Sequence, residues 1–191
     1  MLVLLYAASQ QQFQVGESTL DEVPVFLRRL NWDEVCEVFD RAREQYTWMT
    51  QSGRHLRRTT RANILKAREF ISRMCHNAHI VQEWANTELE ELLNGSDEYS
   101  VDKMNQLRET ARIAAEFRSL SRMRLLKLSL WTVLRAERWP LKQVPSIASL
   151  RNLGANGEID LIVQYEKLKK GAANLARPYG QQFQDHVLSE L

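Results

Sequence analysis

The pattern that most constrains the fold lies between residues 64 and 85, where apolar side chains recur in alternating steps of three and four. This spacing places them on one side of an α-helix and is typical of helices that pack in a left-handed bundle. We therefore expect one long helix from about His55 to Leu93. The apolar seam consists of Ile64, Ala67, Ile71, Met74, Ala78, Val81 and Ala85.

The composition favours helices elsewhere too, because only seven Gly and four Pro interrupt the 191 residues. A sheet with many turns would need more of both residues. A capping-box spacing at Asn31 and Glu34 opens a helix that ends near Gly53, and a further helix is expected over residues 101–139, ending before Pro140. The sequence predicts an all-α fold: an antiparallel bundle of three long helices with shorter helices at both ends.

Breaker residues and composition shifts divide the chain into four parts. We expect an N-terminal arm over residues 1–18, a helical bundle core over 19–139, a linker over 140–157, and a C-terminal helix and tail over 158–191 that pack on the core. The apolar start has no basic residue before it, which argues against a signal peptide. Two cysteines, Cys36 and Cys75, give no disulfide framework, so we expect a soluble intracellular protein of the cytoplasm or nucleus.

A cationic stripe on the predicted helix 101–139 is the first candidate site. Its members lie at offsets 0, 3, 7, 11 and 14, within about an 80° arc at 100° per residue. Guanidinium groups bind phosphate or carboxylate oxygens, and an indole ring stacks on a base or a cation. We expect this stripe to face solvent and the opposite apolar face to be buried. The stripe is Arg124, Lys127, Trp131, Arg135 and Arg138; the apolar face is Met123, Leu126, Leu130, Val133 and Leu134.

A second basic cluster opens the helix that begins near residue 55, where positive charge opposes the helix dipole. Two explanations stay open. A docked anion would stabilise the cluster, and so would internal pairing with the acidic block of residues 83–98 or with the carboxylates of residues 34–40. Residues 51–80 hold seven basic and one acidic group, whereas residues 81–102 hold none and seven. The cluster is Arg54, Arg57, Arg58 and Arg61.

Catalytic and metal-binding motifs are largely missing from the sequence. Cys75, His79 and Glu83 lie at i, i+4 and i+8 on one helical face, but no CxxC or HxxxH spacing supplies further ligands, so we interpret them as bundle residues without a metal. The sequence contains no phosphate-binding glycine loop, no GxSxG and no HExxH. We therefore expect a protein that is not an enzyme and has no cofactor.

The function expected from these features is that of a non-enzymatic helical subunit or adaptor in a larger macromolecular assembly. It would dock through the basic helical stripes and through exposed tryptophans, since large aromatic side chains concentrate at interface hot spots. We expect a protein partner or a second copy of the chain, and neither a membrane nor a small-molecule substrate. The alternative is a protein that binds the nucleic-acid backbone, as nucleocapsid and packaging proteins do. The five tryptophans are Trp32, Trp48, Trp84, Trp131 and Trp139.

Overall fold

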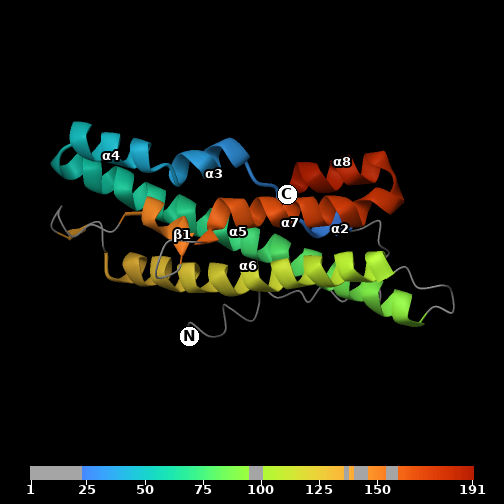
Figure 1. Ribbon diagram of the computed structural model, residues 1–191. Coiled ribbons are helices and arrows are strands. Elements are labelled where there is room, and N and C mark those ends of the chain that lie inside the picture. The colour runs from blue at the N-terminus through green and yellow to red at the C-terminus, as the bar shows by residue number, and fades with distance from the viewer. Residues whose placement is uncertain (1–22, 95–100, 136–137, 140–145, 154–158) are drawn as a thin grey trace.

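A computed structural model describes residues 23–94, 101–135, 138–139, 146–153 and 159–191 of the chain. Its fold is all-α, as predicted. Two long antiparallel helices, α5 (Gly53–Asn94) and α6 (Val101–Val133), run the length of the molecule (Figure 1). The shorter helices α3 (Trp32–Val38), α4 (Arg41–Thr50), α7 (Leu161–Ala176) and α8 (Gln181–Glu190) lie together above them in that view.

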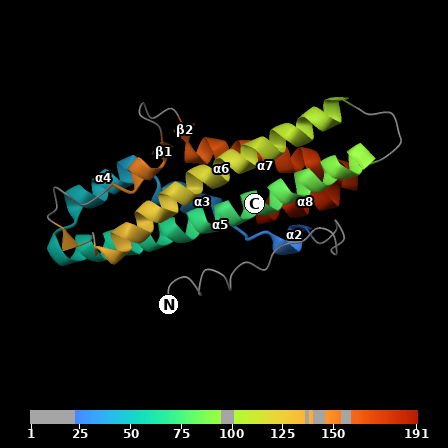
Figure 2. The same cartoon turned by 90° about the horizontal axis from the view of Figure 1, so that it is seen from below.

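The predicted seam of α5 is confirmed, because all seven of its residues are buried. Helix α6 carries a matching seam with the same alternating steps of three and four, and the two seams pack against each other along the hairpin (Figure 2). Seams with this spacing are typical of left-handed bundle packing. The buried residues of α6 are Leu107, Thr110, Ala114, Phe117, Ser121, Arg124, Leu128 and Trp131.

Two long helices are seen where three were expected. The segment predicted as one helix from residue 32 to about 53 is divided into α3 and α4 at Asp40, whose side chain caps α4 by accepting a hydrogen bond from the Ala42 amide at 2.8 Å. Asn31 caps α3 in the same way, accepting from the Glu34 amide. A capping side chain satisfies an amide that the helix leaves free, so each cap starts a new helix.

Helix α6 ends earlier than predicted. It stops at Val133, and Arg135 adopts a left-handed backbone conformation with φ of 49°. An L residue cannot continue a right-handed helix in that conformation. The residues after Val133 are therefore not held to the 100° spacing on which the predicted stripe depended.

Helix α7 covers the α5–α6 pair on one side. Asp160 caps its start, and Gly171 brings it close to α6, since a Cβ atom at residue 171 would lie 2.9 Å from Cγ2 of Thr110. Helix α8 packs on α7 and on α2 (Val23–Phe26). The N-terminal arm and most of the predicted linker lie outside the described residues.

A short segment joins α6 to α7. It contains the 3-10 helix η4 (Ala148–Leu150) and two antiparallel two-residue strands, β1 (Asn152–Leu153) and β2 (Ile159–Asp160). Glu44 of α4 fixes the start of η4 by accepting hydrogen bonds from the Ile147 and Ala148 amides, at 2.7 and 3.2 Å. A second 3-10 helix, η5 (Arg177–Tyr179), connects α7 to α8.

A buried polar group ties three parts of the core together. Asn77 of α5 accepts a hydrogen bond from the Arg28 amide at 2.8 Å and donates to the Arg28 carbonyl at 3.0 Å. Its Nδ2 atom also donates to the Tyr165 hydroxyl of α7 at 3.0 Å. Burial raises the pKa of Tyr165, so the phenol stays protonated. None of the helices in the described part of the chain is long and apolar enough to cross a membrane.

Candidate interaction surfaces

Arg124, the first member of the predicted stripe, is 1% exposed. Its Nε donates a hydrogen bond to the Leu150 carbonyl at 2.6 Å, and Nη2 donates to the Arg151 carbonyl at 3.3 Å. Burial lowers the pKa of Arg124 to about 10, partly offset by the nearby Asp160 carboxylate. The prediction that Arg124 faces solvent is wrong, and its guanidinium instead attaches η4 and the residue after it, Arg151, to α6.

Trp131 is also buried, at 6% exposed, and the prediction of an outward indole is wrong for it. The reason is the α6 seam, which continues from Phe117 through Arg124 and Leu128 to Trp131 in steps of seven, four and three. Lys127 is exposed, and its ammonium lies 5.1 Å from the centre of the Trp131 ring. The ammonium lies over the ring of the buried indole, and the rest of the lysine side chain is at the surface.

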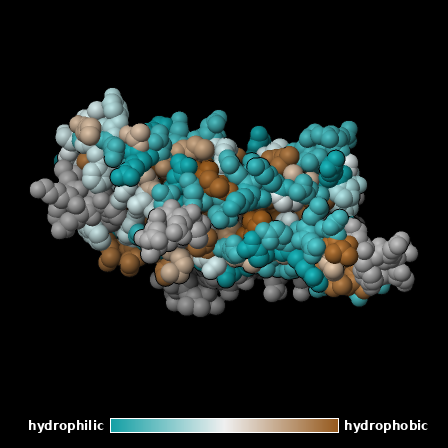
Figure 3. Space-filling view, viewed as in Figure 1, coloured by the Kyte–Doolittle hydropathy of each residue, from teal (hydrophilic) through white to brown (hydrophobic). Residues whose placement is uncertain are grey.

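The apolar face that was expected to be buried is exposed. Its five residues are between 50% and 78% exposed. The four that belong to α6 lie within about an 80° arc of the helix, opposite the α6 seam, and Leu134 follows directly after the helix. Figure 3 shows hydrophobic side chains at the surface at the lower left, where the C-terminal end of α6 lies. We call this set the outer strip. It consists of Met123, Leu126, Leu130, Val133 and Leu134.

The outer strip is bordered by basic residues. Exposed Arg122 and Lys127 lie on its two sides, and the sequence between Glu116 and Glu137 contains no acidic residue. Further toward the N-terminus the same face of α6 is charged, because Arg112 pairs with both Glu109 and Glu116 there. The face therefore changes from paired charges to apolar side chains halfway along the helix.

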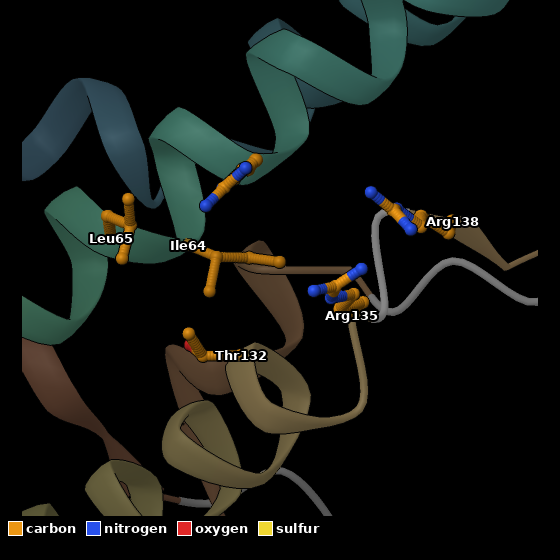
Figure 4. A pocket seen from close by; sticks show the side chains of 6 residues that line it. Ile64, Leu65, Thr132, Arg135 and Arg138 are labelled. Atoms are coloured by element: carbon orange, nitrogen blue, oxygen red, sulfur yellow. The ribbon is translucent and has the colours of Figure 1, made fainter.

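The two basic clusters of the sequence partly meet at the left end of the molecule in Figure 1. Arg61 of α5 and two arginines that follow α6, Arg135 and Arg138, line one small pocket of about 130 Å³. Ile64, Leu65 and Thr132 form the rest of its lining, and Figure 4 shows Arg135 and Arg138 facing the α5 side chains across it. We call this cavity the Arg61 pocket.

Two hydrogen bonds to backbone carbonyls hold the turn that lines the Arg61 pocket. Nη1 of Arg57 donates to the Arg138 carbonyl at 2.9 Å, and the Arg138 amide donates to the Arg135 carbonyl at 2.8 Å. These bonds attach the turn after α6 to the first turns of α5. Arg54 and Arg58 are exposed and do not line the pocket.

A second hollow lies further along α5. It has a volume of about 750 Å³, and Leu65 lines both it and the Arg61 pocket. Arg73, at its far end, pairs with Glu69 and donates to the Arg29 carbonyl at 2.9 Å. We call it the Arg68 groove. Its lining is Arg28, Arg29, Leu65, Arg68, Glu69, Ser72 and Arg73.

The ion pairs of the structure test whether the arginines of the second basic cluster, Arg54, Arg57, Arg58 and Arg61, pair with carboxylates of the chain itself. Among the pairs of the described residues, none involves Arg54, Arg57, Arg58 or Arg61. The carboxylates proposed as internal partners have other contacts: Glu34 pairs with Lys66, Glu37 with Arg43, and Glu88 with Lys103. Residues 95–100 of the acidic block lie outside the described part.

The helical line of Cys75, His79 and Glu83 forms a local contact between side chains. His79 Nδ1 lies 3.6 Å from Glu83 Oε1, and burial raises the pKa of the Cys75 thiol. Within residues 23–94 and the other described ranges, no three His, Cys, Asp or Glu side chains are grouped as metal ligands would be.

The tryptophans do not form exposed anchors. Trp84 and Trp131 are buried, and the remaining three are half-buried. Trp32 stacks on Tyr165 with ring centres 5.8 Å apart and carries Lys169 at 5.2 Å from its ring centre. The expectation that tryptophans project from the surface is therefore wrong.

Comparison with family models, with curated proteins and with solved structures finds no match for this chain. Its function must therefore be inferred from its own surfaces. Two of them, the outer strip and the Arg68 groove, were not predicted from the sequence. The repeat of seven from Phe117 to Arg124 and Trp131 was a signal for the strip's exposure, because residues sharing a seam position share a side of the helix.

Proposed function

We propose that this chain is a non-enzymatic helical subunit or adaptor of a larger assembly, and that it binds an amphipathic helix of a partner protein on its outer strip. The observation that carries the proposal is the exposure of five apolar residues along the last three turns of α6 and the turn after it. Contiguous exposed apolar surface with a polar rim marks interaction sites on soluble proteins.

The length and spacing of the outer strip fit a helix. From Met123 to Val133 the residues recur at steps of three, four and three, and they span about 15 Å at 1.5 Å per residue. Apolar anchors at such steps are what one helix offers to another in helix-in-groove recognition.

The basic residues beside the outer strip indicate which charge the partner helix should carry. Arg122 and Lys127 flank the outer strip, and Arg118 lies one turn before Arg122, with no acid in this part of α6. Complementary charges across an interface raise association rates and exclude wrong partners. The partner helix should therefore carry acidic residues beside its apolar stripe.

The test is native co-purification of the tagged full-length chain, with a double variant, Leu126→Gln with Leu130→Gln. We expect a complex that the wild type retains and this variant loses. The matched control is Ala115→Gln with Ser119→Gln, two positions on the same outer face of α6 but in its polar half. The control should retain the partner.

Four outcomes would overturn the proposal. A strictly monomeric chain without a partner would remove its basis, and so would a complex that survives the Leu126 and Leu130 changes. Native mass spectrometry showing a dimer that the same variant cannot form would make a second copy the occupant. Flotation with phosphatidylserine vesicles, also abolished in that variant, would make the occupant a lipid surface.

The second candidate function is binding of a nucleic-acid backbone. Its support is separate from the outer strip, because it comes from the arginines that meet along α5.

A further inference from the structure

We propose that the Arg61 pocket and the Arg68 groove form one continuous site for the phosphate backbone of a base-paired nucleic acid. The two hollows share Leu65 and follow one side of α5. Their arginines come from three distant parts of the chain: the segment after α2, helix α5 and the turn after α6. This inference does not depend on the outer strip, which uses other residues.

The charge of the site is largely unopposed. Three arginines line the Arg61 pocket, and its described lining contains no carboxylate. Four arginines line the Arg68 groove beside one carboxylate, Glu69, which is already paired with Arg73. No ion pair of the described residues involves Arg28, Arg29 or Arg68. Like charges gathered without counter-ions attract a polyanion and are stabilised by it.

The size of the Arg61 pocket favours one group of a larger ligand. At about 130 Å³ it is smaller than the roughly 300 Å³ at which pockets for whole small molecules begin. Arginine forks bind phosphate oxygens in pairs, so three of them around so small a space suit a single phosphate group. The larger Arg68 groove then receives the neighbouring groups of the same polymer.

The distance between Arg61 and Arg68 along α5 suits phosphates of one strand that are a few nucleotides apart. Arg61 and Arg68 are seven residues apart, two turns of helix, which places them about 10.5 Å apart on one side. One strand of a duplex advances about 3.4 Å along the duplex axis per nucleotide, so this distance corresponds to about three nucleotide steps.

Hydrogen bonds attach the turn that lines the Arg61 pocket to α5. Arg57 holds the Arg138 carbonyl, and Arg138 bonds in turn to the Arg135 carbonyl, so both arginines are attached to α5 before a phosphate arrives. Arg135 keeps its left-handed conformation in this turn. Side chains whose backbone is held by such bonds lose less conformational entropy when they bind a ligand.

The lining also distinguishes paired from unpaired nucleic acid. Proteins that bind single strands generally stack bases on aromatic side chains. The described lining of both hollows contains no aromatic residue, and its apolar members are Ile64 and Leu65. A site that offers arginines and no aromatic ring suits the backbone of a duplex, whose bases are already stacked, and does not read its sequence.

The test measures fluorescence anisotropy of a labelled duplex of about 20 base pairs with the full-length chain over a range of salt concentrations. We expect affinity that falls steeply with salt and is independent of sequence. The triple variant Arg61→Ala, Arg135→Ala, Arg138→Ala should flatten the plot of log affinity against log salt by about 0.9, the contribution of the one phosphate that the Arg61 pocket no longer neutralises. Arg61→Lys should bind more weakly than wild type, since lysine keeps the charge but lacks the fork.

The matched control is Arg108→Ala, an exposed arginine near the start of α6, at the opposite end of the α5–α6 hairpin. It should leave the salt dependence unchanged. The Leu126→Gln, Leu130→Gln variant should also bind the duplex normally, so failure of this inference and failure of the proposed docking helix give different results.

Four outcomes would overturn the inference. They are no duplex binding at low salt, an equal loss of affinity in Arg108→Ala and in the triple variant, and tighter binding of the single strand than of the duplex. The fourth is binding of phosphatidylserine vesicles that depends on the three arginines while the duplex is not bound.

Discussion

Helices α5 and α6 pack against each other through the same seven-residue repeat, yet they distribute their apolar residues differently. In α5 the seam from Ile64 to Ala85 is wholly apolar. In α6 the seam contains Thr110, Ser121 and Arg124, and apolar residues lie on the opposite side. The bundle buries only one side of such a helix, so a second apolar side stays exposed and is available to a partner.

Arg124 explains how α6 tolerates a charge in its seam. The guanidinium donates hydrogen bonds to the Leu150 and Arg151 carbonyls, so the end of η4 is attached to the bundle through it. A buried charge persists only where hydrogen bonds compensate its missing hydration. The seam position is thus used for joining the segment after α6 to the core, and the leucines of the outer strip are left outside.

The largest expected effect separates two adjacent residues of α6. Trp131→Ala should lower the free energy of unfolding by about 4 kcal/mol, because it leaves a cavity in the seam. Leu130→Ala, at a residue 54% exposed, should change it by no more than about 0.5 kcal/mol. Urea unfolding of both variants measures the difference, and equal destabilisation would show that the outer strip is part of the core.

The next effect concerns the charge in the seam. Arg124→Met keeps most of the side-chain length but removes both hydrogen bonds, and it should cost about 2 kcal/mol because the Leu150 carbonyl no longer has its charged donor. Arg122→Met, at an exposed position two residues earlier, is the control and should be nearly neutral. If chemical denaturation finds Arg124→Met as stable as wild type, Arg124 does not anchor the segment after α6.

A pH effect tests the contacts that the middle of α5 makes with the α2 segment, through His76, and with α6, through His79. Burial lowers the pKa of His76, and burial together with Arg118 of α6 lowers that of His79. Both imidazoles therefore bind protons more readily in the unfolded chain, so stability should fall as pH drops below about 6.5 toward the folded-state pKa. The urea midpoint should decrease between about pH 7 and pH 5.5.

The variant that checks this pH effect is His76→Gln with His79→Gln, which should show a smaller decrease over the same interval. His55→Gln, at an exposed residue, should follow wild type. A decrease of the same size in the double variant would assign the pH dependence to other groups.

The smallest effect belongs to the polar half of the outer face of α6. Arg112 pairs with Glu109 and Glu116 in full contact with water, and its pairing with Glu109 lowers the pKa of that carboxyl. Arg112→Ala should cause a slight decrease of thermal stability that vanishes at high salt, because exposed pairs are screened. A decrease that persists in about 1 M salt would indicate a structural role for this face, unlike that of the outer strip.

The sequence predicted α5 better than α6 for a physical reason. Where apolar residues and seam coincide, as from Ile64 to Ala85, periodicity identifies the buried side. In the C-terminal half of α6 the hydrophobic residues around Leu126 outnumber those of the seam. The prediction therefore took the face with more hydrophobic residues as the buried one. The seven-residue spacing of Phe117, Arg124 and Trp131 indicated the opposite face. Arg124 is buried because of hydrogen bonds to Leu150 and Arg151, which helical periodicity does not encode.

The candidate site was predicted in its composition more than in its arrangement. The arginines near residue 61 and those at 135 and 138 were both identified, but their meeting in one pocket depends on the hairpin of α5 and α6 and on the turn at Arg135. In the Arg68 groove, Arg28 and Arg29 lie beside α5 because Asn77 forms hydrogen bonds with the Arg28 backbone. Asn77 and Arg28 are 49 residues apart in the sequence. No local pattern specifies a contact at that separation.

The exposure of the outer strip is tested most directly by thiol labelling in a chain whose native cysteines, Cys36 and Cys75, are replaced. A Leu126→Cys thiol should react in the isolated chain at nearly the rate of the unfolded chain and become protected in the co-purified complex. A Leu128→Cys thiol, at a fully buried seam position, should react at least about a thousandfold more slowly, through opening of the fold. Equal protection of the two thiols in the isolated chain would contradict the assignment of this strip as a free surface.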